Sequence, residues 1–154
     1  MDFDDQLVYA RNILMARPKV LAWFQAQYQY ICVDEAQDTS KIQHEIIRIL
    51  ASKTNNIFMV GDEDQSIYRF RAAYPRALLD FTDTYTNPYI LFLETNYRST
   101  KPIVSAAQRF ISQNINRHSE KHMAASRGNG KPIERITVRK KHQQYSAIAE
   151  ISKK

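Results

Sequence analysis

The chain has 154 residues, of which 44% are apolar, and 22 basic against 16 acidic side chains give a net charge of +6. This is the length of one domain with enough apolar material for a packed core, which excludes a disordered chain, a collagen-like fibre and a disulfide-built miniprotein. The single cysteine, Cys32, cannot form an internal disulfide and favours a reducing, cytoplasmic setting. We expect no membrane role, because no run approaches about 18 uninterrupted apolar residues and Met1–Asp5 lacks the basic start of a signal peptide.

Charge is distributed unevenly along the chain. Residues 1–97 hold 9 basic and 13 acidic side chains, a net charge of −4, whereas residues 98–154 hold 13 basic and 3 acidic ones, a net charge of +10. A basic half indicates a surface able to meet a phosphate backbone, although a short basic tail is more often simply solvated. Charge alone leaves both interpretations open.

The first part of the chain alternates between predicted helices and short apolar strands. Tyr30–Val33 and Ile57–Val60 have no polar interruption, which predicts strands buried on both faces. Helical spacing and caps predict helices at Asp4–Met15, from Pro18 through Val20–Gln27, after Thr39 or Ser40 as far as Ser52–Asn56, after Gln65, and from Pro75 onward. This order predicts an α/β fold with a parallel sheet flanked by helices, whose ligands bind at the carboxyl ends of the strands.

The second part continues the pattern less regularly. Tyr89–Leu93 predicts a third strand of the same sheet, and Pro102–Ile115 predicts a helix with one apolar face. Asn116–Pro132 is polar, basic and contains glycine, so we expect a mobile loop or linker there. A strand at Ile133–Val138 and a short helix near Tyr145–Ile151 are expected to follow, and the chain stops without a helix-ending signal, as if cut.

The cluster Asp34–Asp38 lies at the tip of the first predicted strand. Adjacent carboxylates there suit nucleotide hydrolysis: Asp34 can hold Mg²⁺ and Glu35 can orient or deprotonate the attacking water. The alternative is an exposed turn whose Asp38 caps the next helix.

Two further clusters follow strands. In Gly61–Arg71, Gln65 can hydrogen-bond a phosphate or a water, and the rings of Tyr68 and Phe70 beside arginines such as Arg71 suit single-stranded nucleic acid. The alternative is that the apolar side chains of this run belong to the core. Leu93–Thr100 places an aromatic ring beside an arginine, a pair that can stack on a purine and supply positive charge to a phosphate.

Together the clusters resemble a known family. Asp34–Asp38 resembles motif II (the Walker B equivalent), Gly61–Ala73 resembles motif III and Leu93–Thr100 resembles motif IV of UvrD/Rep/PcrA-type superfamily I DNA helicases. The resemblance spans about Met1–Ile115. It implies a RecA-like, partial P-loop NTPase fold truncated at both ends, with residues 1–93 from the first RecA-like domain and residues 94–154 from motif IV and the start of the second.

The resemblance also implies roles for the site residues. Asp34 would bind the Mg²⁺ of MgATP, with Glu35 beside the metal as the catalytic base. Gln65 would sense the γ-phosphate, Tyr97 would stack on adenine and Arg98 would reach the γ-phosphate. For DNA, the resemblance implies stacking of single-stranded bases on Tyr68 and Phe70, with Arg71 near the strand or an acidic partner. His44 and the histidines of the tail match nothing catalytic and are expected to be ordinary surface or helix residues.

Departures from the family pattern limit what we expect of this chain alone. It has no G-x-x-x-x-G-K-[ST] loop, since its only Gly-Lys pair, Gly130-Lys131, is followed by Pro132, and it lacks motifs V and VI. Ala72 stands where motif III often has glycine. We therefore expect an inactive piece of an ATP-dependent DNA helicase that needs the rest of the helicase chain or a complementing subunit.

Two rival functions stay open at this point. The first is a non-enzymatic helicase remnant that binds single-stranded nucleic acid through Tyr68, Phe70 and the basic half, without any nucleotide effect. The second is a metal-dependent nuclease built on four acids, since clustered carboxylates can hold two metal ions. Those acids are Asp34, Glu35, Asp62 and Asp64.

Overall fold

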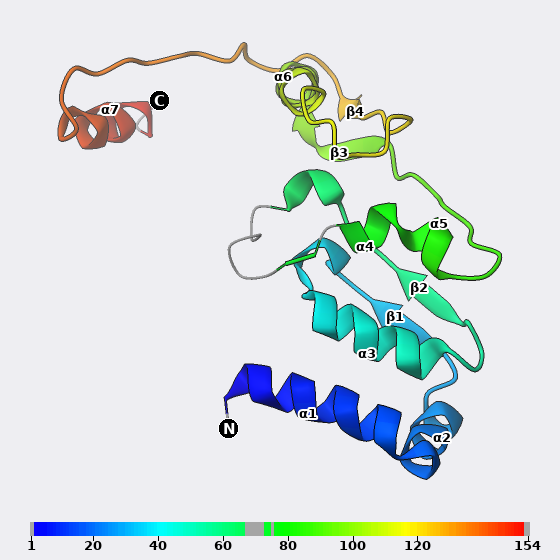
Figure 1. The fold of residues 1–154 in the computed structure, drawn as a ribbon. Helices are drawn as coiled ribbons and strands as arrows, with labels where there is room; N and C mark the ends of the chain where they lie inside the picture. The colour runs from blue at the N-terminus through cyan, green and yellow to red at the C-terminus, as the bar shows by residue number, and fades with distance from the viewer. Residues whose placement is uncertain (1, 67–72, 75, 153–154) are drawn as a thin grey trace. The chain divides into compact units, whose positions relative to one another are not determined.

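The computed structural model describes residues 2–66, 73–74 and 76–152 (Figure 1). They form two compact units: Met1–Leu93 with Asn114–Lys121, and Glu94–Gln113 with His122–Lys154. The first unit is therefore built from two separate stretches of chain. No helix among the described residues is both long enough and apolar enough to cross a membrane.

Three helices of the first unit begin where the sequence predicts. α1 spans Phe3–Ala16, α2 spans Pro18–Gln27 with proline at its start, and α3 spans Lys41–Ala51. α1 starts with a capping box between Asp2 and Asp5, and α3 starts with one between Ser40 and Gln43. Each box satisfies backbone N–H groups that the first helical turn leaves without partners. α1 and α3 are further joined by an ion pair of 3.0 Å between Arg11 Nε and Glu45 Oε2.

The sheet of the first unit consists of two parallel strands, β1 at Ile31–Val33 and β2 at Ile57–Met59. Both strands were predicted, but the expectation that they are buried on both faces is wrong. Val33 is buried, whereas Cys32 and its register partner Phe58 are exposed, Phe58 to 63%. Successive side chains of a strand point to opposite faces, and only one face of this pair is covered in the described part of the chain.

Short turns and helices follow the strand tips. The 3₁₀ turns η1, at Ala36–Asp38, and η2, at Glu63–Gln65, come after β1 and β2. α4 spans Arg76–Leu79 and α5 spans Phe81–Thr84, which confirms a helical segment near the predicted place. The helix-like stretch expected after Gln65 lies largely outside the described residues.

The second unit pairs β3, Thr95–Thr100, with β4, Ala124–Arg127, in a second parallel two-stranded sheet. α6, Lys101–Ile111, follows β3 directly, and α7, Gln143–Ile151, lies near the predicted terminal helix. Strands and helices in this order confirm the α/β class, in the form of small parallel sheets flanked by helices.

Two strand predictions and one loop prediction are wrong. Tyr89–Leu93 and Ile133–Val138 are irregular, and their apolar side chains are largely exposed, with Leu93 at 94%. A strand needs a partner for its backbone hydrogen bonds, and these two runs pair with no described segment. Conversely, Asn116–Pro132 was expected to be a mobile loop or linker, yet it contains β4, and its first residues belong to the first unit.

Gly61 follows the end of β2 and lies against atoms of η1 and α4. A Cβ atom at this position would lie 2.6 Å from Gln37 Oε1, 2.8 Å from Leu78 Cδ1 and 3.1 Å from the Ala36 nitrogen. A hydrogen bond of 3.0 Å from the Ala36 N–H to the Val60 carbonyl fixes the backbone there. Glycine is therefore required by lack of space.

His44 is a helix residue of α3, which is one of the two possibilities expected from the sequence. Its ring lies half-buried on α3, within hydrogen-bond reach of Thr39 Oγ1 and, at 3.3 Å, of the Ala36 carbonyl, with the Tyr74 ring at its edge. Burial lowers the pKa of His44, and the hydrogen bond to Ala36 offsets this only in part. The neutral imidazole therefore ties α3 to the turn that follows β1.

We predict that Gly61→Ala destabilises the first unit by about 1–3 kcal/mol, because the new methyl group must displace backbone and side-chain atoms. Urea denaturation followed by the fluorescence of Trp23, in α2, measures the effect. Gly128→Ala is the matched control: nothing lies within 4 Å of its added Cβ, so its midpoint should stay unchanged. Equal midpoints for the two variants would contradict the crowding at Gly61.

We also predict that stability falls with decreasing pH through the titration of His44. The unfolded chain binds this proton more tightly than the folded one, so stabilisation is lost as the pH drops through about 6.5 and below. His44→Gln should flatten the dependence of the urea midpoint on pH between about 7.5 and 5.5, whereas the exposed control His142→Gln should leave it unchanged. The same slope in both variants would assign the effect to other groups.

Candidate functional site

Asp34 and Glu35 emerge exposed from the carboxyl end of β1. Glu35 has a φ of 47°, in the left-handed region, and its N–H donates to Asp34 Oδ1 at 2.9 Å. A non-glycine residue in this region costs on the order of 1 kcal/mol, and such residues gather at functional sites. The local backbone thus presents two adjacent carboxylates at the tip of the strand.

Gln37 joins this tip to the tip of β2. Its Nε2 donates to Glu35 Oε2 at 2.6 Å, and its Oε1 accepts from the Asp62 N–H at 2.9 Å. The side chain is only 2% exposed. Gln37 has no role predicted from the sequence, because a neutral amide beside three carboxylates carries no signal of its own.

Gln65 lies on the same network through Asp62. Gln65 Nε2 donates to Asp62 Oδ2 at 2.7 Å, while Asp62 Oδ1 accepts from the Asp64 N–H at 3.1 Å. A continuous path therefore runs from Glu35 through Gln37 and Asp62 to Gln65. We call these four residues the strand-tip relay.

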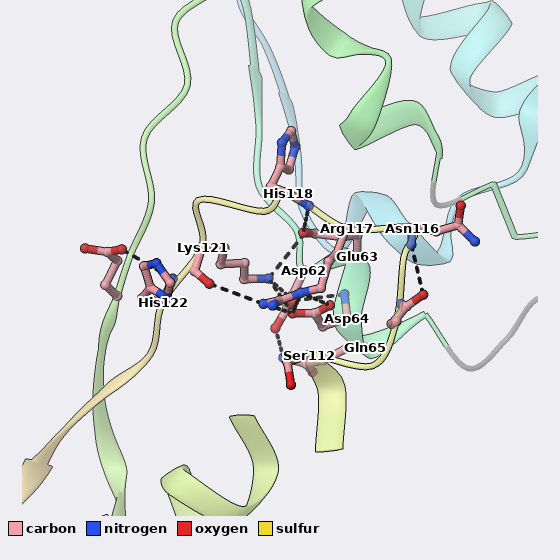
Figure 2. Close-up of polar contacts among 12 residues, drawn as sticks. Asp62, Glu63, Asp64, Gln65, Ser112, Asn116, Arg117, His118, Lys121 and His122 are labelled. Atoms are coloured by element: carbon pink, nitrogen blue, oxygen red, sulfur yellow. Dashed lines mark hydrogen bonds and ion pairs between the residues drawn. The ribbon is translucent and has the colours of Figure 1, made fainter. Parts of the chain in front are cut away.

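Two cations cover the acidic turn after β2 (Figure 2). Arg117 pairs with Asp64, and Lys121 pairs with Asp62. Burial by itself would raise the pKa of Asp62, but the hydrogen bonds from Lys121 and Gln65 and the charge of Lys121 together hold it below its usual value. Burial would lower the pKa of Lys121, and the surrounding carboxylates raise it instead. Both groups are therefore charged at neutral pH.

Two further predicted site residues belong to the second unit. Tyr97 and Arg98 lie on β3, where Tyr97 is 72% exposed. The Asn96 side chain accepts from the backbone N–H groups of Arg98 and Ser99, at 3.0 and 2.7 Å, and so shapes the strand. The proposed DNA contacts lie outside the described residues. They are Tyr68, Phe70 and Arg71.

The exposed carboxylates of Asp34 and Glu35 fit Mg²⁺ chemically. Mg²⁺ prefers oxygen ligands, and in nucleotide sites it is held by one or two carboxylates together with water and phosphate. Within the described ranges, no three side chains of His, Cys, Asp or Glu form a metal-binding group. Asp62 and Asp64 are instead paired with Lys121 and Arg117, which argues against the four-acid nuclease arrangement.

Known proteins match nearly the whole chain. Residues 1–86 match the UvrD/REP helicase N-terminal domain, and residues 91–154 match the UvrD-like helicase C-terminal domain. An ATP-dependent DNA helicase PcrA of Staphylococcus aureus is 43% identical over 133 residues, which is 86% of this chain and 18% of the relative. A probable DNA helicase II homolog of Rickettsia felis is 40% identical over 149 residues, which is 97% of this chain and 23% of the relative.

The chain thus spans about a fifth of the length of these curated relatives. Its α/β architecture is that of a partial RecA-like helicase domain. Because the first of these family matches alone covers more than half of the chain, the chain belongs to the UvrD/Rep family of helicases.

Proposed function

We propose that this chain supplies part of the ATP-hydrolysing site and part of the single-stranded DNA contact of an ATP-dependent DNA helicase. The observation that carries the proposal is the strand-tip relay, which connects the carboxylate suited to activate water with the amide suited to sense phosphate. The relatives named as ATP-dependent DNA helicases support the same activity. In the whole protein, ATP hydrolysis would drive translocation on single-stranded DNA and duplex unwinding.

The relay suggests separate roles for the metal ligand, the catalytic base and the phosphate-sensing amide at the strand tips. Bound Mg²⁺ would neutralise phosphate charge, and Asp34 would hold it. Gln37 occupies one oxygen of Glu35 and leaves the other free to accept a hydrogen bond from the attacking water. Asp62 takes one amide hydrogen of Gln65 and leaves the second to donate to a phosphate oxygen. The protein thereby fixes both groups before the nucleotide arrives.

The remaining assignments rest on the resemblance. Residues 1–93 would belong to the first RecA-like domain, and residues 94–154 would carry motif IV and the start of the second. Tyr97, whose ring is exposed, would stack on adenine, and Arg98 would reach the γ-phosphate. Single-stranded DNA would be held by the motif III side chains. These are Tyr68, Phe70 and Arg71.

We predict that the purified chain alone does not turn over ATP, with or without single-stranded DNA. No G-x-x-x-x-G-K-[ST] segment is present in its sequence to cradle the β- and γ-phosphates. Phosphate release with Mg²⁺, compared with that of Glu35→Gln, is the measurement. DNA-stimulated release that disappears in the variant would contradict the prediction and point to a replacement for the phosphate loop.

A chimera tests the positive part of the proposal. This chain replaces the matching segment of full-length Staphylococcus aureus PcrA, and the chimera's DNA-stimulated ATP turnover is measured. We expect turnover in the chimera and a loss of about 10²–10⁴-fold with Glu35→Gln, because a general base contributes that much.

Asp83→Asn is the matched control in the chimera, since it neutralises an exposed acid on α5 away from the relay. It should leave the rate within about twofold of the unmodified chimera, as expected for a surface substitution. A folded chimera that binds single-stranded DNA but shows no turnover would favour the non-enzymatic remnant. Equal rates for Glu35→Gln and Asp83→Asn would remove Glu35 from catalysis.

A further inference from the structure

The stretch Asn114–Lys121 returns to the first unit and lies on the acidic turn after β2 (Figure 2). Arg117 binds Asp64 with both ends of its guanidinium edge: Nε to Oδ1 at 3.0 Å and Nη2 to Oδ2 at 2.9 Å. The two side chains are only 13% and 11% exposed. A bidentate pair of this kind fixes orientation as well as distance.

Lys121 extends the same contact to the start of the turn. Its Nζ binds Asp62 and lies 3.3 Å from Glu63 Oε2 and 3.4 Å from Asp64 Oδ2. The backbone of the same stretch also contributes, since the His118 N–H donates to Glu63 Oε1 at 3.1 Å. Three consecutive carboxylates are therefore held by two cations and one backbone N–H group.

These contacts affect the Gln65 side chain through the Asp62 carboxylate, which both Lys121 and Gln65 contact. Asp62 Oδ1 receives Lys121 and the Asp64 N–H, while Oδ2 receives the Gln65 amide. Without the cations, three adjacent negative charges would repel one another in a partly buried turn, and Asp62 would keep only the Asp64 N–H and the Gln65 amide as partners. The orientation of the Gln65 side chain thus depends on residues more than fifty positions later in the chain.

We propose that Arg117 and Lys121 are positioning residues of the nucleotide site, which hold the Asp62–Asp64 turn so that Gln65 presents its amide at the strand tips. That this positioning affects ATP hydrolysis rests on the proposed function of Gln65. The positioning of Gln65 by the two cations does not depend on that function. A second consequence concerns charge: these two cations are already neutralised inside the first unit, so they do not belong to the basic surface offered to nucleic acid.

The positioning is tested by NMR on the ¹⁵N-labelled chain, with the side-chain amide of Gln65 as the probe and that of Gln37 as the internal reference. In Lys121→Met we expect the chemical-shift separation between the two Gln65 amide protons, one bonded to Asp62 and one free, to be lost, while the Gln37 amide signals stay unchanged. Lys121→Arg should retain the separation at Gln65. Lys53→Met, which removes an exposed lysine of the same unit, is the matched control and should change neither amide.

Exchanging the charges of Arg117 and Asp64 provides a second test, which holds even if one of the single variants does not fold. Arg117→Asp and Asp64→Arg should each remove the separation of the Gln65 amide protons, and the double variant should restore it because the pair is re-formed with reversed signs. An unchanged Gln65 separation in a folded Lys121→Met chain would overturn the proposal. So would a folded double variant that does not restore the separation at Gln65.

The ATPase kinetics of the chimera distinguish the positioning role of Lys121 from the proposed role of the site in ATP hydrolysis. If both hold, Lys121→Met should lower the DNA-stimulated kcat for ATP about tenfold with little change in KM, and Lys121→Arg should recover it. If the NMR result holds while kcat is unchanged, Lys121 positions Gln65 but Gln65 does not serve hydrolysis. If the NMR result fails while Glu35→Gln still abolishes turnover, the proposed function stands and the positioning role falls.

Discussion

The buried amide of Gln37 is the interaction on which the site depends. Two short parallel strands share few backbone hydrogen bonds, so their tips need a further tie to stay in register. Gln37 provides it by donating to a side chain at one tip and accepting from the backbone at the other. Gly61 leaves the space that this amide needs, and the His44 ring contacts the Ala36 carbonyl of the turn that contains Gln37. A buried amide with both ends satisfied adds order at little cost, whereas losing one partner would leave an unpaired polar group.

Electrostatics divide the acids at the two strand tips into two kinds. Asp34 and Glu35 are exposed and without a cation partner among the described residues, which suits them to a metal and a water. Asp62 and Asp64 are neutralised by Lys121 and Arg117 and act as structural acceptors. The net charge of +10 on residues 98–154 therefore overstates the positive surface of that half, because part of it compensates acids of the other. Counting charges along a sequence cannot separate these uses.

Local rules predicted the helices well and the strands unevenly. α1, α2 and α3 follow from apolar period, proline and capping boxes, all of which act within a few residues. Tyr89–Leu93 has the composition of a strand but no pairing partner, whereas β4 lies in a polar stretch and is a strand because it pairs with β3. Strand formation is decided by a partner far away in the sequence, and composition does not reveal that partner.

The sequence by itself determined the family and the α/β class, and it predicted Asp34, Glu35 and Gln65 as site residues, because motifs and the elements around them are carried by short contiguous runs. Only the tertiary structure decided that Gln37 links the strand tips, across 25 residues, and that Arg117 pairs with Asp64, across 53. The physical reason is the range of the interactions. Caps, periodicity and motifs are local, whereas a buried hydrogen bond or ion pair exists only once folding has brought its two ends together.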